Sequence, residues 1–117
     1  MSKTLLILNG APYGSENTYN GLRLAGSLSK RDGHEVRVFL MGDAASSAKK
    51  GQAVPKGFYN VETMLGTVTH QGGIVGVCGS CMDARGIVPD ELAEGSHRGS
   101  LEEVTEWTLW ADKVLVF

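Results

Sequence analysis

Short apolar runs recur along the chain, separated by longer segments in which apolar and polar residues mix. Runs of this kind, bounded by glycine, asparagine or aspartate, are typical of strands that are buried on both faces of a sheet. The pattern predicts strands at residues 4–8, 34–41, 73–78 and 114–117.

The segments between these runs place apolar residues at helical spacing. Leu22, Ala25 and Leu28 lie about one turn apart, which predicts a helix that ends near residue 30, with Ser15 as its cap. The same reasoning predicts further helical segments at residues 45–50, 61–68, 80–84 and 101–111. Between them, residues 51–57 are expected to form a flexible surface loop, because Pro55 lies inside the stretch.

The last predicted helix begins with the pattern of a capping box. The Ser100 side chain is expected to accept a hydrogen bond from the backbone of Glu103, whose carboxylate reaches back to the start of the helix. We expect one face of this helix to carry Leu101, Val104, Thr108 and Ala111. Trp107 and Trp110 lie three residues apart on it, and one of them is expected to mark either the core or a subunit contact.

Strands that alternate with helices predict an α/β fold with a mainly parallel sheet covered on both faces. The 117 residues have the length of one ordinary domain, so we expect a single domain over residues 1–117. Ligands bind such sheets beyond the carboxyl ends of the strands. Because the loop after Leu8 and the segment after Val77 both lie at this edge, we expect them to converge on one shallow site.

Charge and hydropathy indicate which partners and which cellular location to expect. The formal net charge is −2, and lysines and arginines are scattered along the sequence, so we expect no direct binding of nucleic acid. The apolar run near the amino terminus stops at Asn9-Gly10, which is too short for a signal segment or a membrane span. We therefore expect a cytoplasmic protein, in a compartment where thiols are kept reduced.

Both cysteines of the chain lie in the segment GVCGSCMDARG, residues 76–86. Cys78 ends a predicted strand, and Gly79-Ser80 begin a helical turn whose unpaired N–H groups face the sulfur. This placement predicts a lowered pKa for the Cys78 thiol, hence a reactive thiolate. Arg85 adds positive charge if its side chain folds back. The alternative is a pair of small, inert buried side chains.

The sequence gives little support for a metal site or a nucleotide-binding site. Structural zinc needs about four ligands, and the chain offers one CxxC pair with three isolated histidines, so we expect no metal site. The loop NGAPYGSE lacks the motifs that bind phosphates or dinucleotides. As strand-end neighbours, Tyr13 and Ser15 of this loop are expected to line the mouth of the cysteine site.

Five segments in order resemble the DsrE/DsrF-like (YchN-like) family of sulfur-relay proteins: YGSENTYNGLRLAGSL, GHEVRVFLMGDAA, PKGFYNVETML, VCGSCMDARGI and WADKVLVF. The resemblance covers essentially the whole chain. It implies a three-layer α/β sandwich with about five strands, assembly as a homotrimer or hexamer, and sulfur carried as a persulfide on a cysteine. That role falls on Cys78, whereas Cys81 matches a second cysteine found only in some members.

The sequence therefore predicts a sulfurtransferase-like carrier that exchanges sulfur with donor and acceptor proteins and needs no cofactor. Its reactive residues are Cys78 and Cys81, with Gly79, Ser80 and Arg85 around the sulfur. A thiol-disulfide oxidoreductase that uses the same CxxC is the alternative, as is a non-catalytic assembly subunit. The three prolines argue against the oxidoreductase, because none sits naturally on a strand facing the dithiol.

Overall fold

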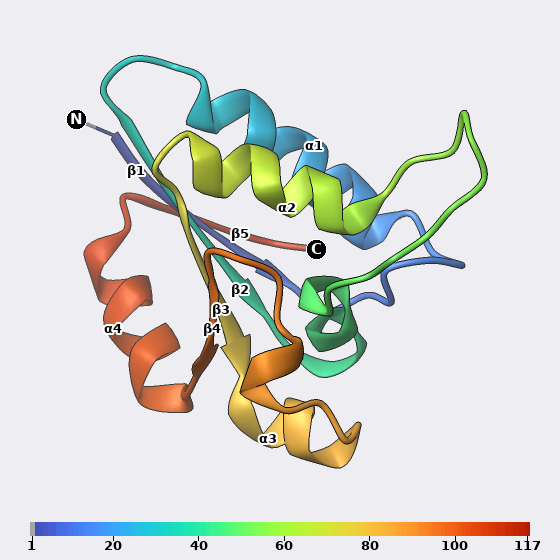
Figure 1. The fold of residues 1–117 in the computed structure, drawn as a ribbon. Coiled ribbons are helices and arrows are strands. Elements are labelled where there is room, and N and C mark those ends of the chain that lie inside the picture. Colours follow the sequence, from blue (N-terminus) through green and yellow to red (C-terminus); the bar gives the residue numbers. More distant parts are fainter. Residues whose placement is uncertain (1) are drawn as a thin grey trace.

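The computed structural model describes residues 2–117, which form a five-stranded sheet with helices on both faces (Figure 1). The strands are β1 (Ser2–Leu8), β2 (His34–Leu40), β3 (Ile74–Cys78), β4 (Ser96–Gly99) and β5 (Lys113–Val116). The helices are α1 (Asn17–Ser29), α2 (Val61–His70), α3 (Gly79–Ala84) and α4 (Leu101–Trp110), with 3₁₀ helices η1 (Gly42–Ala48) and η2 (Pro89–Glu91). The strand order is β4-β3-β2-β1-β5, and every neighbouring pair is parallel. The predicted α/β fold is confirmed.

Alternate residues of β1 and β2 pack into two separate cores. Leu6 and Leu8 of β1 pack toward α1 and α2, which lie side by side on one face of the sheet (Figure 1). Leu5 points to the opposite face and packs with α4. This period of two is the geometry of a strand with both faces covered, and it explains why the strand sequences read as continuous apolar runs.

The core under α4 is small and aromatic. Val104 and Trp107 are its buried helix residues, and the Trp107 ring meets Phe39 of β2 edge to face at a centroid distance of 5.9 Å. The predicted apolar face was therefore partly wrong: Leu101, the first residue of α4, is 76% exposed. Trp110 is half-buried, with the Arg37 guanidinium 3.9 Å from its ring centroid.

Two predicted caps differ from the structure. Glu16, not Ser15, occupies the cap position of α1, and the Ser15 hydroxyl only accepts a long 3.4 Å bond from the Asn17 backbone. At α4 the Ser100 hydroxyl accepts from the Glu103 backbone at 3.1 Å, as predicted. The Glu103 carboxylate does not complete the box, because it binds His97 Nε2 at 2.7 Å instead.

The strand β4 was not predicted from the sequence. Its residues are Ser-His-Arg-Gly, with no apolar run, because it is an edge strand that packs against β3 on one side only. Its pairing places Gly99 opposite Cys78. The helical turn predicted from Ala45 is the 3₁₀ helix η1, which begins earlier, at Gly42. None of the helices within residues 2–117 combines the length and apolar character that a membrane crossing requires.

Candidate functional site

The junction of β3 and α3 holds both cysteines. Cys78 is the last residue of β3 and also the cap residue of α3, which begins at Gly79 with no loop between them. Cys81 follows one turn later, and its thiol donates to Cys78 Sγ across 2.7 Å. Both cysteines are half-buried, so part of each residue is accessible to solvent.

The surroundings of Cys78 favour its thiolate. Partial burial raises its pKa, but hydrogen bonds from the Cys81 thiol, the Ser80 hydroxyl and the backbone N–H groups of both residues outweigh the burial. The pKa of Cys78 therefore lies below its ordinary value, as its position at the start of α3 predicts. The Ser80 hydroxyl lies 3.4 Å from the Cys78 sulfur.

Cys81 has the opposite tendency. Burial raises its pKa, and so does its role as hydrogen-bond donor to Cys78, although the backbone N–H of Gly42 donates to its sulfur at 3.2 Å. The two thiols are therefore unequal: Cys78 ionises first, and protonated Cys81 stabilises the charge. Two neighbouring groups whose pKa values are pushed apart have separate roles in a reaction.

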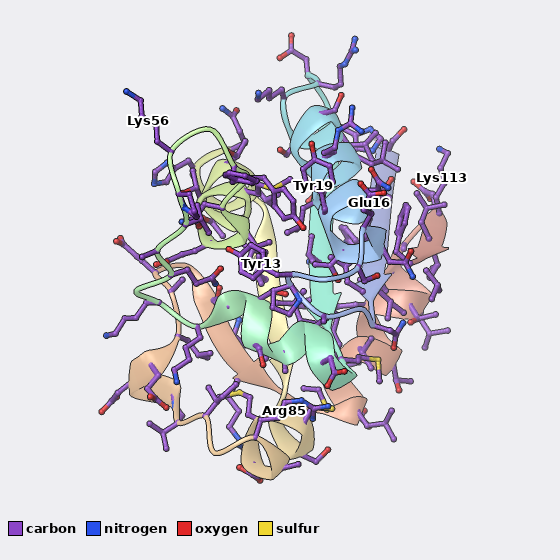
Figure 2. All side chains as sticks on the ribbon, turned by 90° about the vertical axis from the view of Figure 1, so that its right-hand side faces the viewer. Tyr13, Glu16, Tyr19, Lys56, Arg85 and Lys113 are labelled. Atoms are coloured by element: carbon purple, nitrogen blue, oxygen red, sulfur yellow. The ribbon has the colours of Figure 1, made fainter. Side chains whose placement is uncertain are left out.

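Arg85 lies on the Cys81 side of α3. Its guanidinium pairs with Asp43 of η1 at 2.6 Å and donates to the Cys81 carbonyl at 3.1 Å. Figure 2 shows the arginine between η1 and α3. Its positive charge lowers the pKa of Cys81, a small effect next to burial. The predicted charge thus reaches the dithiol, but from the side of the second cysteine.

Arg98 is the residue near Cys78 that the sequence analysis missed. It lies on β4 and pairs with Asp83 of α3 through two bonds of 2.8 and 3.0 Å. A cleft of about 400 Å³ opens beside Cys78. Its lining consists of Phe39, Met41, Cys78, Gly79, Ser80, Arg98, Gly99, Ser100, Leu101 and Val104.

Gly79 allows Arg98 and β4 to pack closely against the start of α3, next to Cys78. A Cβ at Gly79 would lie 2.9 Å from the Arg98 guanidinium and 2.9 Å from the Gly99 carbonyl. Both distances are shorter than real Cβ contacts, so a side chain at Gly79 requires Arg98 and the edge strand β4 to shift. The arginine consequently packs against the residue that directly follows Cys78.

Tyr13 and Ser15 make their contacts away from the cleft. The Tyr13 hydroxyl donates to Gln52 at 2.6 Å and accepts from the Val61 backbone, and its ring stacks on Tyr59. In Figure 2, Tyr13 lies across η1 from Arg85. Neither Tyr13 nor Ser15 is among the residues that line the cleft beside Cys78, so these contacts do not support the prediction that they border it.

Two other clefts lie away from the sulfurs. One, of about 490 Å³, runs between α1 and α2, and the other, of about 500 Å³, lies between α2 and the segment before β4. Both are larger than the cysteine cleft, but neither contains a nucleophilic thiol. Within residues 2–117, no three side chains of the His, Cys, Asp or Glu type are placed to hold one metal ion.

Comparisons with known proteins agree with this architecture. Residues 2–117 match the profile of the DsrE/DsrF-like family. Protein YchN of Escherichia coli is 44% identical over the full length of both chains, and its crystal structure superposes with a TM-score of 0.94. An uncharacterized protein of Methanopyrus kandleri is 33% identical over 96% of this chain and 91% of its own. The structure of a protein of unknown function from Methanobacterium thermoautotrophicum, 13% identical, shares the fold with a TM-score of 0.74 over 98% of this chain and 99% of its own.

Proposed function

The chain belongs to the DsrE/DsrF-like family, and from this premise we propose that it is a sulfur-relay protein that carries sulfane sulfur as a persulfide on Cys78. The observation that carries the proposal is the lowered pKa of a half-buried cysteine at the start of α3, in an open cleft. A carrier needs a nucleophilic thiolate with access to its donor, and it needs no cofactor.

Loading is a single displacement at sulfur. The Cys78 thiolate attacks the sulfane sulfur of a donor persulfide, a new S–S bond forms, and the donor thiolate leaves with the electron pair. Unloading is the same step in reverse, with an acceptor thiolate attacking the outer sulfur. The N–H groups of Ser80 and Cys81 stabilise the negative charge that returns to Cys78.

Cys81 is proposed to limit the lifetime of the loaded state. Its thiolate attacks the inner sulfur of the Cys78 persulfide, hydrosulfide leaves, and the two cysteines join in a disulfide. The proximity of the two sulfurs, 2.7 Å, supports this step, whereas the raised pKa of Cys81 slows it because the attacking thiolate is scarce. Sulfur therefore stays on Cys78 long enough to be transferred.

The remaining predicted site residues have supporting roles in this proposal. Gly79 admits the close packing beside the sulfur, and the Ser80 hydroxyl donates to the thiolate. Arg85 holds α3 against η1 through Asp43. Tyr13 and Ser15 are proposed only to hold the shape of the loop after β1, because their hydrogen bonds are with Gln52 and Asn17.

A thiol-disulfide oxidoreductase is the second candidate, favoured by one observation. The two sulfurs lie within one helical turn, and the more acidic cysteine comes first, an order that dithiol catalysis also uses. The two functions differ in what the reduced protein does: an oxidoreductase reduces insulin disulfides catalytically, and a carrier gains sulfur from a sulfane donor.

We also propose a cytoplasmic homotrimer or hexamer that meets separate donor and acceptor proteins, as the family resemblance implies. Large apolar side chains on α4 and β5 support the assembly: Leu109 is 83% exposed and Val116 is 65% exposed. Burial of these side chains against a second copy of the chain would remove apolar surface from water.

Intact-protein mass spectrometry after incubation with glutathione persulfide tests the carrier proposal. Wild type and Cys81→Ser should each gain the mass of one sulfur atom, and Cys78→Ser should gain none. The gain should last longer in Cys81→Ser, because no neighbouring thiolate remains to release hydrosulfide. Loading of Cys78→Ser but not Cys81→Ser would reverse the roles, and a wild type that reduces insulin but never loads would favour the oxidoreductase.

A further inference from the structure

Arg98 is the cation of the cleft that contains the Cys78 sulfur. We propose that Arg98 recognises the anionic part of the sulfur donor, so that this cleft selects donors whose sulfane sulfur is bonded to an oxyanion group, of which thiosulfate is the simplest. The inference rests on the proposed carrier function and names the donor class for the same site.

The guanidinium of Arg98 has contacts on two sides. Its Cζ and Nη2 atoms occupy the space where a side chain of Gly79 would begin, and Gly79 directly follows Cys78. Asp83, one turn further along α3, accepts from Nη1 and Nη2. The arginine of the edge strand is thus held against the first turn of α3, beside the nucleophile.

The bond to Asp83 leaves hydrogen-bonding capacity for a ligand. A guanidinium has five N–H donors in a planar fork, and Asp83 takes two of them. Ser80 and Ser100 line the same cleft. The Ser80 hydroxyl is bonded to the Cys78 sulfur, whereas the Ser100 hydroxyl accepts from the Glu103 backbone and keeps its own O–H as a donor. An oxyanion in this cleft therefore meets a cation and the Ser100 hydroxyl, the chemistry that suits a sulfonate-type group.

The reaction itself creates the need for a cation. The nucleophile is the Cys78 thiolate, and a thiosulfate dianion approaching it is repelled. A positive charge at the cleft wall offsets this repulsion and then stabilises the leaving group. The pKa of Arg98 is raised chiefly by its hydrogen bond to Asp83, with a smaller contribution from the charge of Cys78 itself.

The other arginine of the site cannot replace Arg98. Arg85 is bound to Asp43 and to the Cys81 carbonyl, and it is not among the residues that line the cleft. Its charge interacts with Cys81 more than with Cys78: the pKa of Arg85 is raised chiefly by its hydrogen bond to Asp43, and Cys81 is the larger of the two thiol contributions. Arg98 therefore lines the cleft beside Cys78, whereas Arg85 lies beside Cys81.

The loading step from thiosulfate balances without any further reactant. The Cys78 thiolate attacks the outer sulfur, the S–S bond of thiosulfate breaks, and sulfite leaves with the electron pair. The product is a persulfide anion on Cys78, so the total charge of the reactants equals that of the products. No oxidant or reductant takes part.

A pair of alkylating agents tests the anion recognition apart from sulfur transfer. Iodoacetate is an anion, and iodoacetamide is its neutral counterpart of nearly the same size. Both react with the thiolate of Cys78, so the ratio of their rate constants cancels any change in thiolate fraction. The measurement uses the Cys81→Ser background, in which Cys78 is the single thiol of the chain.

Two variants should move this ratio in opposite directions. Arg98→Met removes the cation and should lower the iodoacetate to iodoacetamide ratio by about three- to tenfold, the effect of one charge a few Å away at a partly exposed site. Asp83→Asn breaks the same ion pair but leaves Arg98 uncompensated, so it should raise the ratio. A role confined to holding α3 against β4 would change both variants in the same direction.

Arg23→Met is the matched control, because it alters the net charge equally in the groove between α1 and α2. Its ratio should stay at the background value. Arg98→Lys should restore most of the ratio that Arg98→Met loses. An unchanged ratio in Arg98→Met, or equal changes in Arg98→Met and Arg23→Met, would overturn the proposal.

Sodium thiosulfate provides the second arm, read by intact mass. Cys81→Ser should load one sulfur, and its Arg98→Met derivative should load at least threefold more slowly. Loading from glutathione persulfide but not from thiosulfate would overturn the donor class while the carrier function stands. No loading from either donor would defeat the carrier function, and the donor class with it, even if the alkylation ratio still responds to Arg98.

Discussion

Replacing Gly79 by alanine is the sharpest structural test of the cleft. The new Cβ would lie 2.9 Å from the Arg98 guanidinium and 2.9 Å from the Gly99 carbonyl. The guanidinium is the far end of a flexible side chain and can move at low cost. The carbonyl belongs to β4, opposite Cys78 in the parallel pairing, and it can move only if the edge strand shifts.

The expected cost follows from these contacts. Overpacking of this size destabilises a fold by about 1–3 kcal/mol. The alanine recovers up to about 1 kcal/mol, because glycine is a poor helix former. The net loss is about 0–3 kcal/mol, which in a chain of 117 residues lowers Tm by up to roughly 12 °C.

Gly66→Ala is the matched control. Gly66 lies in the middle of α2, and a Cβ there meets nothing within 4 Å. This alanine should therefore stabilise the protein by about 0.5–1 kcal/mol. Urea unfolding of both variants at one protein concentration gives the two values. If Gly79→Ala proves as stable as Gly66→Ala, the close packing of Gly79 against Arg98 and β4 is wrong.

Two further predictions concern the thiols and the assembly. The rate at which iodoacetamide alkylates Cys78, followed against pH, gives the pKa of that thiol. The pKa should lie below the ordinary thiol value in Cys81→Ser, whose hydroxyl still donates to the sulfur, and should be higher in Cys81→Ala than in Cys81→Ser, because alanine has no donor. Identical pKa values in the two variants would show that the hydrogen bond from residue 81 does not matter. Because the pKa of Cys78 is lower in the folded state, its contribution to stability is complete above the unfolded pKa and is lost as the pH falls through the folded pKa. Light scattering at micromolar concentration should report a trimer or hexamer that Leu109→Glu weakens, and a wild-type monomer would refute the assembly.

The strands of the central sheet were predictable because they are buried on both faces. Residues 5–8 and 38–41 are continuous apolar runs, and β1 and β2 contain most of them. The reactive cysteine was predictable for a related reason. The strand that ends at Cys78 fixes where α3 begins, and the direction of α3 fixes which sulfur faces its N–H groups.

The rest of the site depends on contacts between distant segments. Arg98 lies on a polar edge strand that leaves no apolar pattern, so nothing in the sequence links it to Cys78, twenty residues earlier. Gly79, directly after Cys78, is the one nearby residue that reflects the contact with Arg98. Its small size is explained only by the fold, in which β4 packs closely against it. The Glu103 carboxylate left its predicted cap for the same reason, because β4 brings His97 within hydrogen-bonding distance.

Locating the carried sulfur within the chain tests the central claim most directly. Wild-type protein is loaded with glutathione persulfide, its free thiols and persulfides are alkylated with iodoacetamide, and the peptide that spans residues 57–85 is sequenced by tandem mass spectrometry. The account predicts that the additional sulfur atom lies on Cys78 and that Cys81 carries the alkyl group alone. Additional sulfur on Cys81, or a Cys78–Cys81 disulfide with no sulfur gained at any time, would contradict it.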